Sequence, residues 1–368
     1  MSRHAPLVLL AAGGTGGHLF PAEALAHVLQ ARGIAVDLAT DNRAAGYAGH
    51  FPARSIHVIP ADTVRGSNPF RLLWTLAVLG VGIVKAVFLL FRLRPDAVVG
   101  FGGYPTFPPL IAAWLTRTPR IVHEQNAVMG RANRALASRA SAIATGYPNI
   151  FAARPDLAAK ATHTGNPVRG AVREAAAIPY EVPQGNHPVR LLVFGGSQGA
   201  RIMSEIVPGA IERCVLALRS RFDVVQQCRA EDVAEVKAVY ARLGLRAEVA
   251  TFFNDLPGRM AASQLVIARS GASTVAELAA IGRPAILVPL PHALDNDQLA
   301  NAMALAAAGG AMLVRQTDFT SERLAQELMQ LFGDPAQLAA MASSARRTGN
   351  ADAAERLADL VLRVARLA

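Results

Sequence analysis

The sequence contains little cysteine and few charged residues. It has 2 Cys in 368 residues, and charged residues make up 17% of the chain. Cys214 and Cys228 lack CxxC spacing, which argues against a disulfide scaffold and fits the reduced thiols of a cytosolic protein. Low charge combined with 52% hydrophobic residues excludes a disordered chain. The length and the apolar content therefore predict a globular protein with material for two cores.

Acidic residues are also in deficit, since 27 Asp and Glu stand against 37 Lys and Arg, a formal net charge of +10. A positive excess attracts nucleic acid, anionic lipid or phosphorylated substrates, and composition does not choose among them. A nucleic-acid-binding protein would need Lys and Arg clustered with aromatic residues. The chain has no long basic run, so we expect no nucleic-acid partner.

An apolar run at residues 6–12 superficially resembles a signal peptide, but it is short and leads directly into Gly13 and Gly14. A buried strand that enters a glycine loop explains this pattern better. We therefore expect that the chain is not exported.

The longest apolar stretch lies at residues 72–91 and holds one charge, Lys85. Twenty residues suffice to span a bilayer, but Lys85, Gly80 and Gly82 disfavour a span. Two interpretations have equal support: a pair of buried helices, or a surface patch, residues 70–92, that enters the membrane interface. In the second, basic residues would face lipid phosphates beside apolar ones: Arg71, Arg92 and Arg94 beside Phe70, Trp74, Phe88 and Phe91.

Residues 7–18, LVLLAAGGTGGH, and residues 191–200, LLVFGGSQGA, share one pattern. Each is an apolar, strand-like run followed by Gly-Gly-x-x-Gly and then by a helical pattern. The distance between them is too long for a solenoid repeat. The pattern predicts an α/β protein with two doubly wound domains, each beginning with a strand, a glycine turn and a helix.

The rest of the chain continues the alternation of strands and helices. Prolines and glycines at residues 175–188 interrupt the pattern and predict an interdomain linker, and the tail from Ala353 has one apolar helical face that needs a partner surface. Strands are predicted at 34–40, 96–100, 120–124, 191–194, 224–227, 247–251, 265–268 and 285–288.

His18 follows the first glycine loop, at the carboxyl end of a predicted strand, where open α/β sheets bind ligands. A lone histidine is as often structural, so this position alone does not decide its role. Residues 102–106 and 123–126 also follow predicted strands, so we expect them to face the same crevice as His18. Arg169, just before the linker, is placed to meet a phosphate.

The second glycine loop, residues 195–199, departs from G-x-G-x-x-G and lacks the lysine of a P-loop. Its backbone amides, the Ser197 hydroxyl and a helix N-terminus suit a diphosphate. No acidic residue stands where a dinucleotide ribose would need one between residues 191 and 221. This absence argues against an NAD-dependent dehydrogenase.

Glu277 has two interpretations. Ser273 or Thr274 could cap the helix that begins near Ala272, with Glu277 as the carboxylate of a capping box. Alternatively, Glu277 accepts hydrogen bonds from both hydroxyls of a ribose. Residues 289–298, which include Gln298, form either a sugar-reading loop or an ordinary surface loop.

These motifs, in this order, closely resemble those of the MurG family, the bacterial GlcNAc transferases that convert lipid I to lipid II in peptidoglycan synthesis. The resemblance runs from about residue 6 to the C-terminal helix, and the ordered set is far more specific than any one motif. The segments that carry it are 13–18, 102–104, 123–126, 165–169, 195–199, 269–277 and 295–298.

The resemblance implies a GT-B architecture, with two Rossmann-like doubly wound domains facing each other across a cleft. Residues 1–170 would bind the acceptor and the membrane, with the helix at 350–368 packing back on them. Residues 171–188 would be the linker, and residues 189–349 would bind UDP-GlcNAc.

The resemblance also implies roles for single residues. Glu277 would accept the ribose hydroxyls, Phe253 would lie by the uracil through its backbone, and Ser197 with Arg169 would contact the diphosphate. Phe253 departs from the family pattern, where a branched aliphatic residue is more usual. Further substrate-binding residues would be Thr15, Gly16, Gly17, Asn126, Ala272, Ser273, Thr274 and Gln298.

The implied reaction is an inverting transfer in which the 4-hydroxyl of MurNAc attacks the anomeric carbon of UDP-GlcNAc. His18 is the candidate base, because the pKa of an unperturbed imidazole, about 6.5, suits neutral pH. No Asp-x-Asp metal site is evident, so we expect no metal and no cofactor. The family works as a peripheral enzyme on the cytoplasmic face of the inner membrane, with cell-wall synthesis and division proteins as expected partners. A UDP-GlcNAc 2-epimerase or another glycosyltransferase is the alternative.

Overall fold

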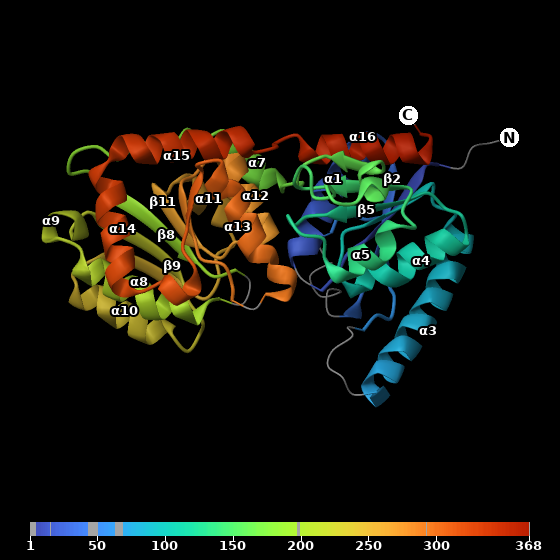
Figure 1. The fold of residues 1–368 in the computed structure, drawn as a ribbon, viewed down its shortest axis with the longest axis horizontal. Helices are drawn as coiled ribbons and strands as arrows, with labels where there is room; N and C mark the ends of the chain where they lie inside the picture. Colours follow the sequence, from blue (N-terminus) through green and yellow to red (C-terminus); the bar gives the residue numbers. More distant parts are fainter. Residues whose placement is uncertain are drawn as a thin grey trace. The chain divides into compact units, whose positions relative to one another are not determined.

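The computed structural model describes residues 5–14, 16–42, 51–62, 69–196, 199–291 and 293–367. The chain divides into two compact units (Figure 1). Unit 1 comprises Met1–Arg169 and Asn350–Ala368, and unit 2 comprises Gly170–Gly349. Thr15, Ser197 and His292 lie outside the described residues.

Unit 1 is built on a parallel sheet of seven strands in the order β3-β2-β1-β4-β5-β6-β7. The strands are β1 (Leu7–Ala11), β2 (Ala35–Thr40), β3 (Ile56–Val58), β4 (Ala97–Gly100), β5 (Arg120–Glu124), β6 (Ala142–Thr145) and β7 (Ala161–His163). The helices are α1 (Gly16–Ala31), α3 (Pro69–Leu93), α4 (Phe107–Leu115), α5 (Arg131–Ala137), α6 (Pro155–Ala158) and α16 (Ala353–Ala365), with the 3-10 helix η2 (Tyr104–Thr106).

Strand β1 shows why both faces of this sheet are covered. All five of its residues are buried, so it lacks the polar alternation of a strand with one solvated face. Val8 and Leu10 pack in one cluster with residues of α1 and α16. Leu9 and Ala11 pack in a second cluster with residues of α3, α4 and α5. The C-terminal helix α16 thus lies on the sheet of unit 1.

Unit 2 repeats the plan with six parallel strands in the order β10-β9-β8-β11-β12-β13. The strands are β8 (Val189–Phe194), β9 (Phe222–Gln227), β10 (Arg246–Ala250), β11 (Leu265–Ala268), β12 (Ala285–Leu287) and β13 (Ala311–Leu313). The helices are α7 (Gly170–Ala176), α8 (Arg201–Arg213), α9 (Leu216–Arg219), α10 (Val233–Arg242), α11 (Leu256–Ala261), α12 (Ala272–Ile281), α13 (Asp297–Ala307), α14 (Ser321–Gly333) and α15 (Pro335–Thr348), with the 3-10 helices η3 (Leu294–Asn296) and η4 (Gln316–Asp318).

The strands predicted from the sequence are confirmed, and 120–124 and 265–268 match β5 and β11 residue for residue. The segment expected to be a linker, 171–188, differs from the expectation because most of helix α7 lies within it. The Arg283 guanidinium is buried and donates to the carbonyl oxygens of Ile178 and Pro179. This arginine holds the segment that follows α7 on the rest of unit 2.

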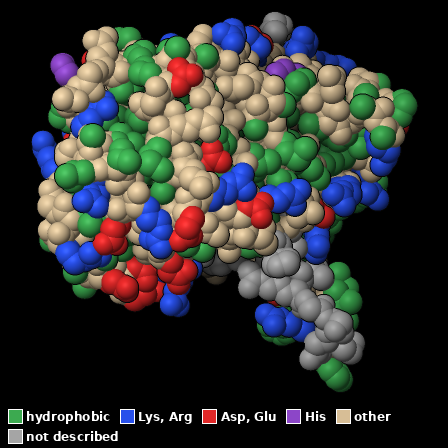
Figure 2. All heavy atoms as spheres, turned by 60° about the vertical axis from the view of Figure 1, so that its left-hand side comes forward, with side chains coloured by type: hydrophobic (Ala, Val, Ile, Leu, Met, Phe, Trp, Pro, Cys, Tyr) green, Lys and Arg blue, Asp and Glu red, His purple; other side chains and the backbone are tan. Residues whose placement is uncertain are grey.

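Helix α3 is one continuous helix of 25 residues, which excludes the buried helix pair. Its buried stripe packs on unit 1 and consists of Thr75, Leu79, Gly82, Ala86 and Leu90. Large apolar side chains occupy the rest of its surface: Phe70, Leu72, Leu73, Trp74, Leu76, Val81, Val84, Phe88 and Phe91 are exposed. Figure 2 shows hydrophobic and basic side chains on this helix where it projects at the lower right.

The two glycines inside α3 have different surroundings. A Cβ at Gly82 would overlap the carbonyl oxygen of Pro60 and would lie 3.1 Å from Cγ of Pro108. A Cβ at Gly80 would meet no atom within 4 Å among the described residues. Gly82 is therefore needed for the close approach of α3 to unit 1, whereas Gly80 is not.

We expect opposite effects from alanine at these two positions. Gly82→Ala should lower the free energy of unfolding of unit 1 by about 1–3 kcal/mol, because the backbone of Pro60 must move. Gly80→Ala should raise it by about 0.5–1 kcal/mol through helix propensity. Urea unfolding followed by tryptophan fluorescence measures both, because the 2 Trp of the chain, Trp74 and Trp114, lie in unit 1. Equal effects of the two substitutions would contradict the packing argument.

Candidate functional site

Each sheet has a point where the strand order reverses, and ligands of doubly wound folds bind outside the carboxyl ends of the strands at that point. In unit 1 the reversal lies between β1 and β4, and in unit 2 between β8 and β11. We call the ends of the strands on this side the carboxyl edge of each unit. The glycine motifs of the sequence lie directly after these four strands or one residue beyond.

His18 lies at the carboxyl edge of unit 1, in the first turn of α1. Gly102 and Gly103, which follow β4, have φ of 89° and 73°, in the left-handed region that favours glycine. A Cβ at either position would lie 3.4 Å and 3.3 Å from ring atoms of His18. The imidazole therefore packs against bare backbone, and the two glycine loops lie together as predicted.

Polar residues from β5 and α5 form a buried cluster near His18. The Glu124 carboxylate accepts hydrogen bonds from N of Asn126 (2.9 Å), N of Gly130 (3.0 Å) and Nδ2 of Asn133 (2.8 Å). Burial raises the pKa of Glu124, and these hydrogen bonds oppose the shift. Glu124 thus fixes the loop that follows β5 and the start of α5.

Both histidines of this region are neutral at pH 7. Burial lowers the pKa of His18, while hydrogen bonding by Gln125 and by the backbone of Phe101 opposes the shift. Burial lowers the pKa of His123 to about 4, and the nearby His18 adds to this effect. A neutral imidazole keeps one ring nitrogen unprotonated, so His18 has the protonation state that a general base requires.

The other predicted residues of unit 1 lie around the start of α1 and the end of β5. Gly16 and Gly17 begin α1. The guanidinium of Arg169 lies over the ring of Phe20, 4.1 Å from its centroid. Asn126 donates through Nδ2 to the Glu124 carboxylate at 3.2 Å. The structure therefore links Arg169 to the helix that carries His18 and holds Asn126 on Glu124.

At the carboxyl edge of unit 2, the glycine loop leads into helix α8. Gly196 and Gly199 have φ of 85° and 68°, and a Cβ at Gly195 would overlap the amide nitrogen of Ala200. The residue before the first turn of α8 is Ala200, whose side chain cannot cap it. The first amides of α8 and the positive end of its dipole are suited to an anion.

Helix α12 rules out the capping interpretation of Glu277. The helix begins at Ala272 with Gly271 as its N-cap, so Glu277 is the sixth helical residue, beyond the reach of a capping box. Glu277 is 6% exposed. Ala272, Ser273 and Thr274 form the first turn and are half-buried, and Oγ of Ser273 is buried without a hydrogen-bond partner among the described residues.

Gln298 lies in the first turn of α13. Its side-chain Oε1 accepts from N of Leu290 (3.0 Å), and its carbonyl oxygen accepts from Oγ of Ser270 (2.8 Å). The bond to Ser270 ties α13 to the loop after β11. The amide NH2 group of Gln298 can donate to a sugar hydroxyl while Oε1 holds Leu290.

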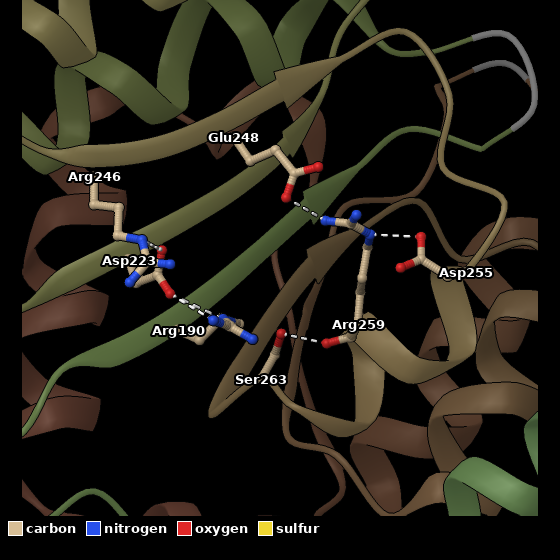
Figure 3. A network of polar contacts seen from close by, with 7 residues as sticks. All are labelled: Arg190, Asp223, Arg246, Glu248, Asp255, Arg259 and Ser263. Atoms are coloured by element: carbon tan, nitrogen blue, oxygen red, sulfur yellow. Dashed lines mark hydrogen bonds and ion pairs between the residues drawn. The ribbon is translucent and has the colours of Figure 1, made fainter.

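Phe253 lies in the loop after β10, and its ring is buried. The Arg259 guanidinium stacks on it, 4.2 Å from the ring centroid. Arg259 also bridges Glu248 and Asp255, at 2.6 Å each (Figure 3). These bonds hold the loop in place, so only the backbone of Phe253 is available to a ligand.

The hollow beside this network, about 400 Å³, is a poor candidate for the ligand site. Arg190 and Arg246 both pair with Asp223 (Figure 3), so the charges that line it are already balanced. Arg190 and Asp223 lie near the amino ends of β8 and β9, opposite the carboxyl edge.

Sequence analysis gave no role to Gln125 or Asn133, which the structure brings to the candidate site. Nδ2 of Asn133 donates to Glu124 and, at 3.2 Å, to the carbonyl oxygen of His123. Asn133 interrupts the apolar stripe of α5, and a polar residue among buried neighbours was the available signal. Among the described residues, no group of three His, Cys, Asp or Glu side chains could hold a metal ion.

Comparison with known proteins identifies the family. Residues 8–145 match the glycosyltransferase family 28 N-terminal domain, and residues 190–357 match the glycosyltransferase family 28 C-terminal domain. A protein of Rhodopseudomonas palustris (strain BisB5) is 59% identical over 99% of both chains. It is named UDP-N-acetylglucosamine--N-acetylmuramyl-(pentapeptide) pyrophosphoryl-undecaprenol N-acetylglucosamine transferase.

Solved structures agree with this assignment. The crystal structure of Acinetobacter baumannii MurG is 32% identical, covers 97% of this chain and 99% of its own, and has a TM-score of 0.79. A Neisseria meningitidis UDP-GlcNAc 2-epimerase bound to UDP-GlcNAc covers 97% of this chain and 100% of its own, with a TM-score of 0.68 and 16% identity, which shows a shared fold alone. The chain therefore belongs to glycosyltransferase family 28, within it to the MurG group, and has the GT-B architecture of two Rossmann-like domains.

Proposed function

We propose that this chain transfers GlcNAc from UDP-GlcNAc to the 4-hydroxyl of MurNAc in undecaprenyl-pyrophosphoryl-MurNAc-pentapeptide, converting lipid I to lipid II in peptidoglycan synthesis. The observation that carries the proposal is the 59% identity, over 99% of both chains, to a relative named for this transfer. The neutral His18 at the carboxyl edge of unit 1 supplies the base that the reaction needs.

The reaction is a single displacement with inversion. The acceptor oxygen forms a bond to the anomeric carbon of GlcNAc as the bond from that carbon to the diphosphate oxygen breaks. His18 takes the proton of the acceptor hydroxyl, and UDP leaves with the electron pair of the broken bond. A base assists because the hydroxyl is a weak nucleophile until its proton is removed.

The donor binds along the carboxyl edge of unit 2. Glu277 accepts the ribose hydroxyls, and the backbone at Phe253 lies by the uracil. The amides after β8 stabilise the diphosphate together with Ser197 and Arg169, with no metal ion. Each such donor lowers the barrier by roughly 3 kcal/mol where charge develops on the leaving group.

The remaining predicted residues read the sugars. Gln298 donates to a GlcNAc hydroxyl through Nε2, and Asn126 contacts the same sugar. The first turn of α12, with the amides of Ala272, Ser273 and Thr274, faces the donor. Gly16 and Gly17 face the acceptor from the start of α1, and Thr15 also contacts it.

His18→Ala should abolish most of the transfer without weakening UDP binding. We expect kcat to fall by about 100-fold or more, because general base catalysis contributes that much. A radiolabelled GlcNAc transfer assay with lipid I in detergent measures kcat, and calorimetry measures the Kd of UDP. His27→Ala is the matched control, since His27 lies exposed on the same helix and its loss should leave both quantities unchanged.

Three results would contradict these assignments. Equal losses of kcat and UDP affinity in His18→Ala would remove His18 as the base. If the wild-type protein showed no transfer and released an epimerised UDP-sugar instead, the proposed activity would be that of a 2-epimerase and not of a transferase. If a chelator abolished transfer, the proposal that the reaction needs no metal ion would be rejected.

Glu277→Gln should chiefly raise the KM for UDP-GlcNAc. A hydrogen bond to a charged group contributes about 1.5–3 kcal/mol, so we expect a rise in KM of about tenfold or more with little change in kcat. Glu235→Gln, an exposed glutamate on α10 of the same unit, should leave the KM unchanged. An unchanged KM in Glu277→Gln would return Glu277 to a structural role.

The proposal includes a membrane surface, because the acceptor carries an undecaprenyl chain. Within the described residues, α3 is the helix long and apolar enough to cross a bilayer, and 22% of its most apolar window is buried. Its middle packs against Pro60 and Pro108 at Gly82, and a helix docked in this way cannot also be surrounded by lipid. We propose that α3 lies in the membrane interface and holds the enzyme on the cytoplasmic face as a peripheral protein.

The chemistry of α3 fits an anionic surface. Trp74 and Phe88 are 68% and 70% exposed, and Arg71, Lys85 and Arg92 lie on the same helix. Aromatic side chains enter the interface while Lys and Arg meet lipid phosphates. An anionic lipid surface would thus attract part of the positive net charge of the chain.

Vesicle sedimentation tests the membrane proposal. The wild-type protein should sediment with phosphatidylglycerol vesicles, less with phosphatidylcholine vesicles, and less at high salt because salt screens the charges. Trp74→Ser with Phe88→Ser should weaken binding by about tenfold or more, since each large apolar side chain contributes roughly 1.5–3 kcal/mol when buried. Val215→Ser with Leu216→Ser removes an exposed apolar pair from unit 2 and should change nothing. Unchanged binding by the α3 variant would contradict the proposal.

A further inference from the structure

The side-chain amide of Gln125 is held in one orientation. Gln125 follows β5 and is 2% exposed. Its Nε2 donates to the carbonyl oxygen of Phe101 (2.8 Å) and to Nδ1 of His123 (3.0 Å). A carbonyl oxygen only accepts, so the group that faces Phe101 must be the NH2 end of the amide. This contact assigns Nε2 and Oε1 of Gln125 without ambiguity.

The state of His123 agrees with this assignment. Nε2 of His123 lies 3.2 Å from the carbonyl oxygen of Gly165, so this nitrogen must carry a proton. Burial lowers the pKa of His123 to about 4, and the neutral ring therefore has an unprotonated Nδ1. That nitrogen accepts from Gln125. The hydrogen bonds thus form a chain that runs from Gly165 through His123 and Gln125 to Phe101. A carbonyl oxygen stands at each end of this chain, and both ends require the same orientation of the Gln125 amide.

The other end of the Gln125 amide is an acceptor without a donor. Oε1 of Gln125 and Nδ1 of His18 are both buried, and neither has a hydrogen-bond partner at ordinary geometry among the described residues. Burial lowers the pKa of His18, and the nearby Gln125 side chain and Phe101 backbone favour the protonated ring and oppose this shift. A hydrogen bond between Oε1 of Gln125 and Nδ1 of His18 would satisfy both of these atoms.

We propose that Gln125 is a positioning residue that fixes the tautomer of His18, with the proton on Nδ1 facing Oε1 of Gln125 and Nε2 left free to accept the proton of the acceptor hydroxyl. The inference rests on the proposed role of His18 as base. Oε1 of Gln125 can only accept a hydrogen bond, so pairing it with the other buried, unpartnered atom, Nδ1 of His18, requires the proton on Nδ1. Gln125 acts through His18 and does not itself touch the reacting atoms.

Two other titratable groups lie near this pair. His123 interacts with His18 but stays neutral above about pH 4. The Glu124 carboxylate is turned to the amides of Asn126, Gly130 and Asn133. A change at Gln125 should therefore show in the titration of His18 and in its tautomer.

The first test reads the tautomer directly and needs no turnover. Nitrogen-15 NMR of the full chain, labelled at histidine and assigned with His18→Gln, should show His18 protonated on Nδ1 at pH 7.5. In Gln125→Met, a substitution that keeps the size but removes both ends of the amide, His18 should become a mixture of tautomers. A wild-type His18 protonated on Nε2, or a tautomer unchanged in Gln125→Met, would overturn the proposal.

The second test uses the pH profile of transfer. Gln125→Met should lower kcat at the plateau by about tenfold or more, with the KM for UDP-GlcNAc within about twofold. The acid limb of kcat should move to lower pH, because the protonated His18 loses an acceptor. Gln226→Met is the matched control, since it removes a fully buried glutamine amide from unit 2; its acid limb should stay in place.

The two tests separate the possible failures. A drop in kcat with an unmoved acid limb would mean that Gln125 only supports the fold, and the positioning role would be rejected. If His18→Ala retained full activity, the assignment of His18 as base would be rejected. The NMR experiment would still show whether Gln125 fixes the tautomer of His18. If Gln125→Met did not fold, the wild-type tautomer alone would decide.

Discussion

The neighbouring positions of β1 and β4 determine where the chemistry of unit 1 can lie. In this strand order the loops after β1 and β4 leave the sheet side by side, and ligands bind where they diverge. The loop after β4 passes close to His18, since a Cβ at Gly103 would lie 3.3 Å from the imidazole, tighter than an ordinary contact. The glycine backbone therefore holds the ring, and the neighbouring strand β5 brings Gln125 behind it. Each later element of the site depends on this contact.

Unit 2 uses the same strand order for a different purpose. Its loops after β8 and β11 lead into helices whose N-cap residues, Ala200 and Gly271, have no side chain that could occupy the first turn. The amides there remain available to a diphosphate, which needs fixed donors more than a titrating group. In unit 1 the corresponding place holds His18, whose lowered pKa suits a base. In the function that we propose, one topology thus supplies the base in one unit and the fixed dipoles in the other.

The sequence predicted what depends on neighbours along the chain. Apolar runs gave the strands, and the glycines after them gave the loops at the carboxyl edge. It could not decide the role of Glu277, because capping depends on where α12 begins, and that start is set by Gly271 rather than by Ser273 or Thr274. It placed residues 123–126 at the crevice but gave no individual role to Gln125, whose hydrogen-bond partner Phe101 is distant in the sequence. Hydrogen bonds between separate strands leave no local pattern to read.

Helix α3 shows the same limit in its packing. Its periodicity suited a buried helix as well as a surface one, because apolar side chains surround it. The structure distinguishes the two by exposure: the buried stripe holds only two large apolar side chains, Leu79 and Leu90, while larger ones such as Trp74 and Phe88 point away from unit 1. A helix stabilised by burial of its large side chains would have the reverse arrangement. Gly82 and Ala86 allow the backbone of α3 to approach unit 1 closely. Most large apolar side chains of α3 therefore remain exposed, which is the observation that supports the proposed lipid interface.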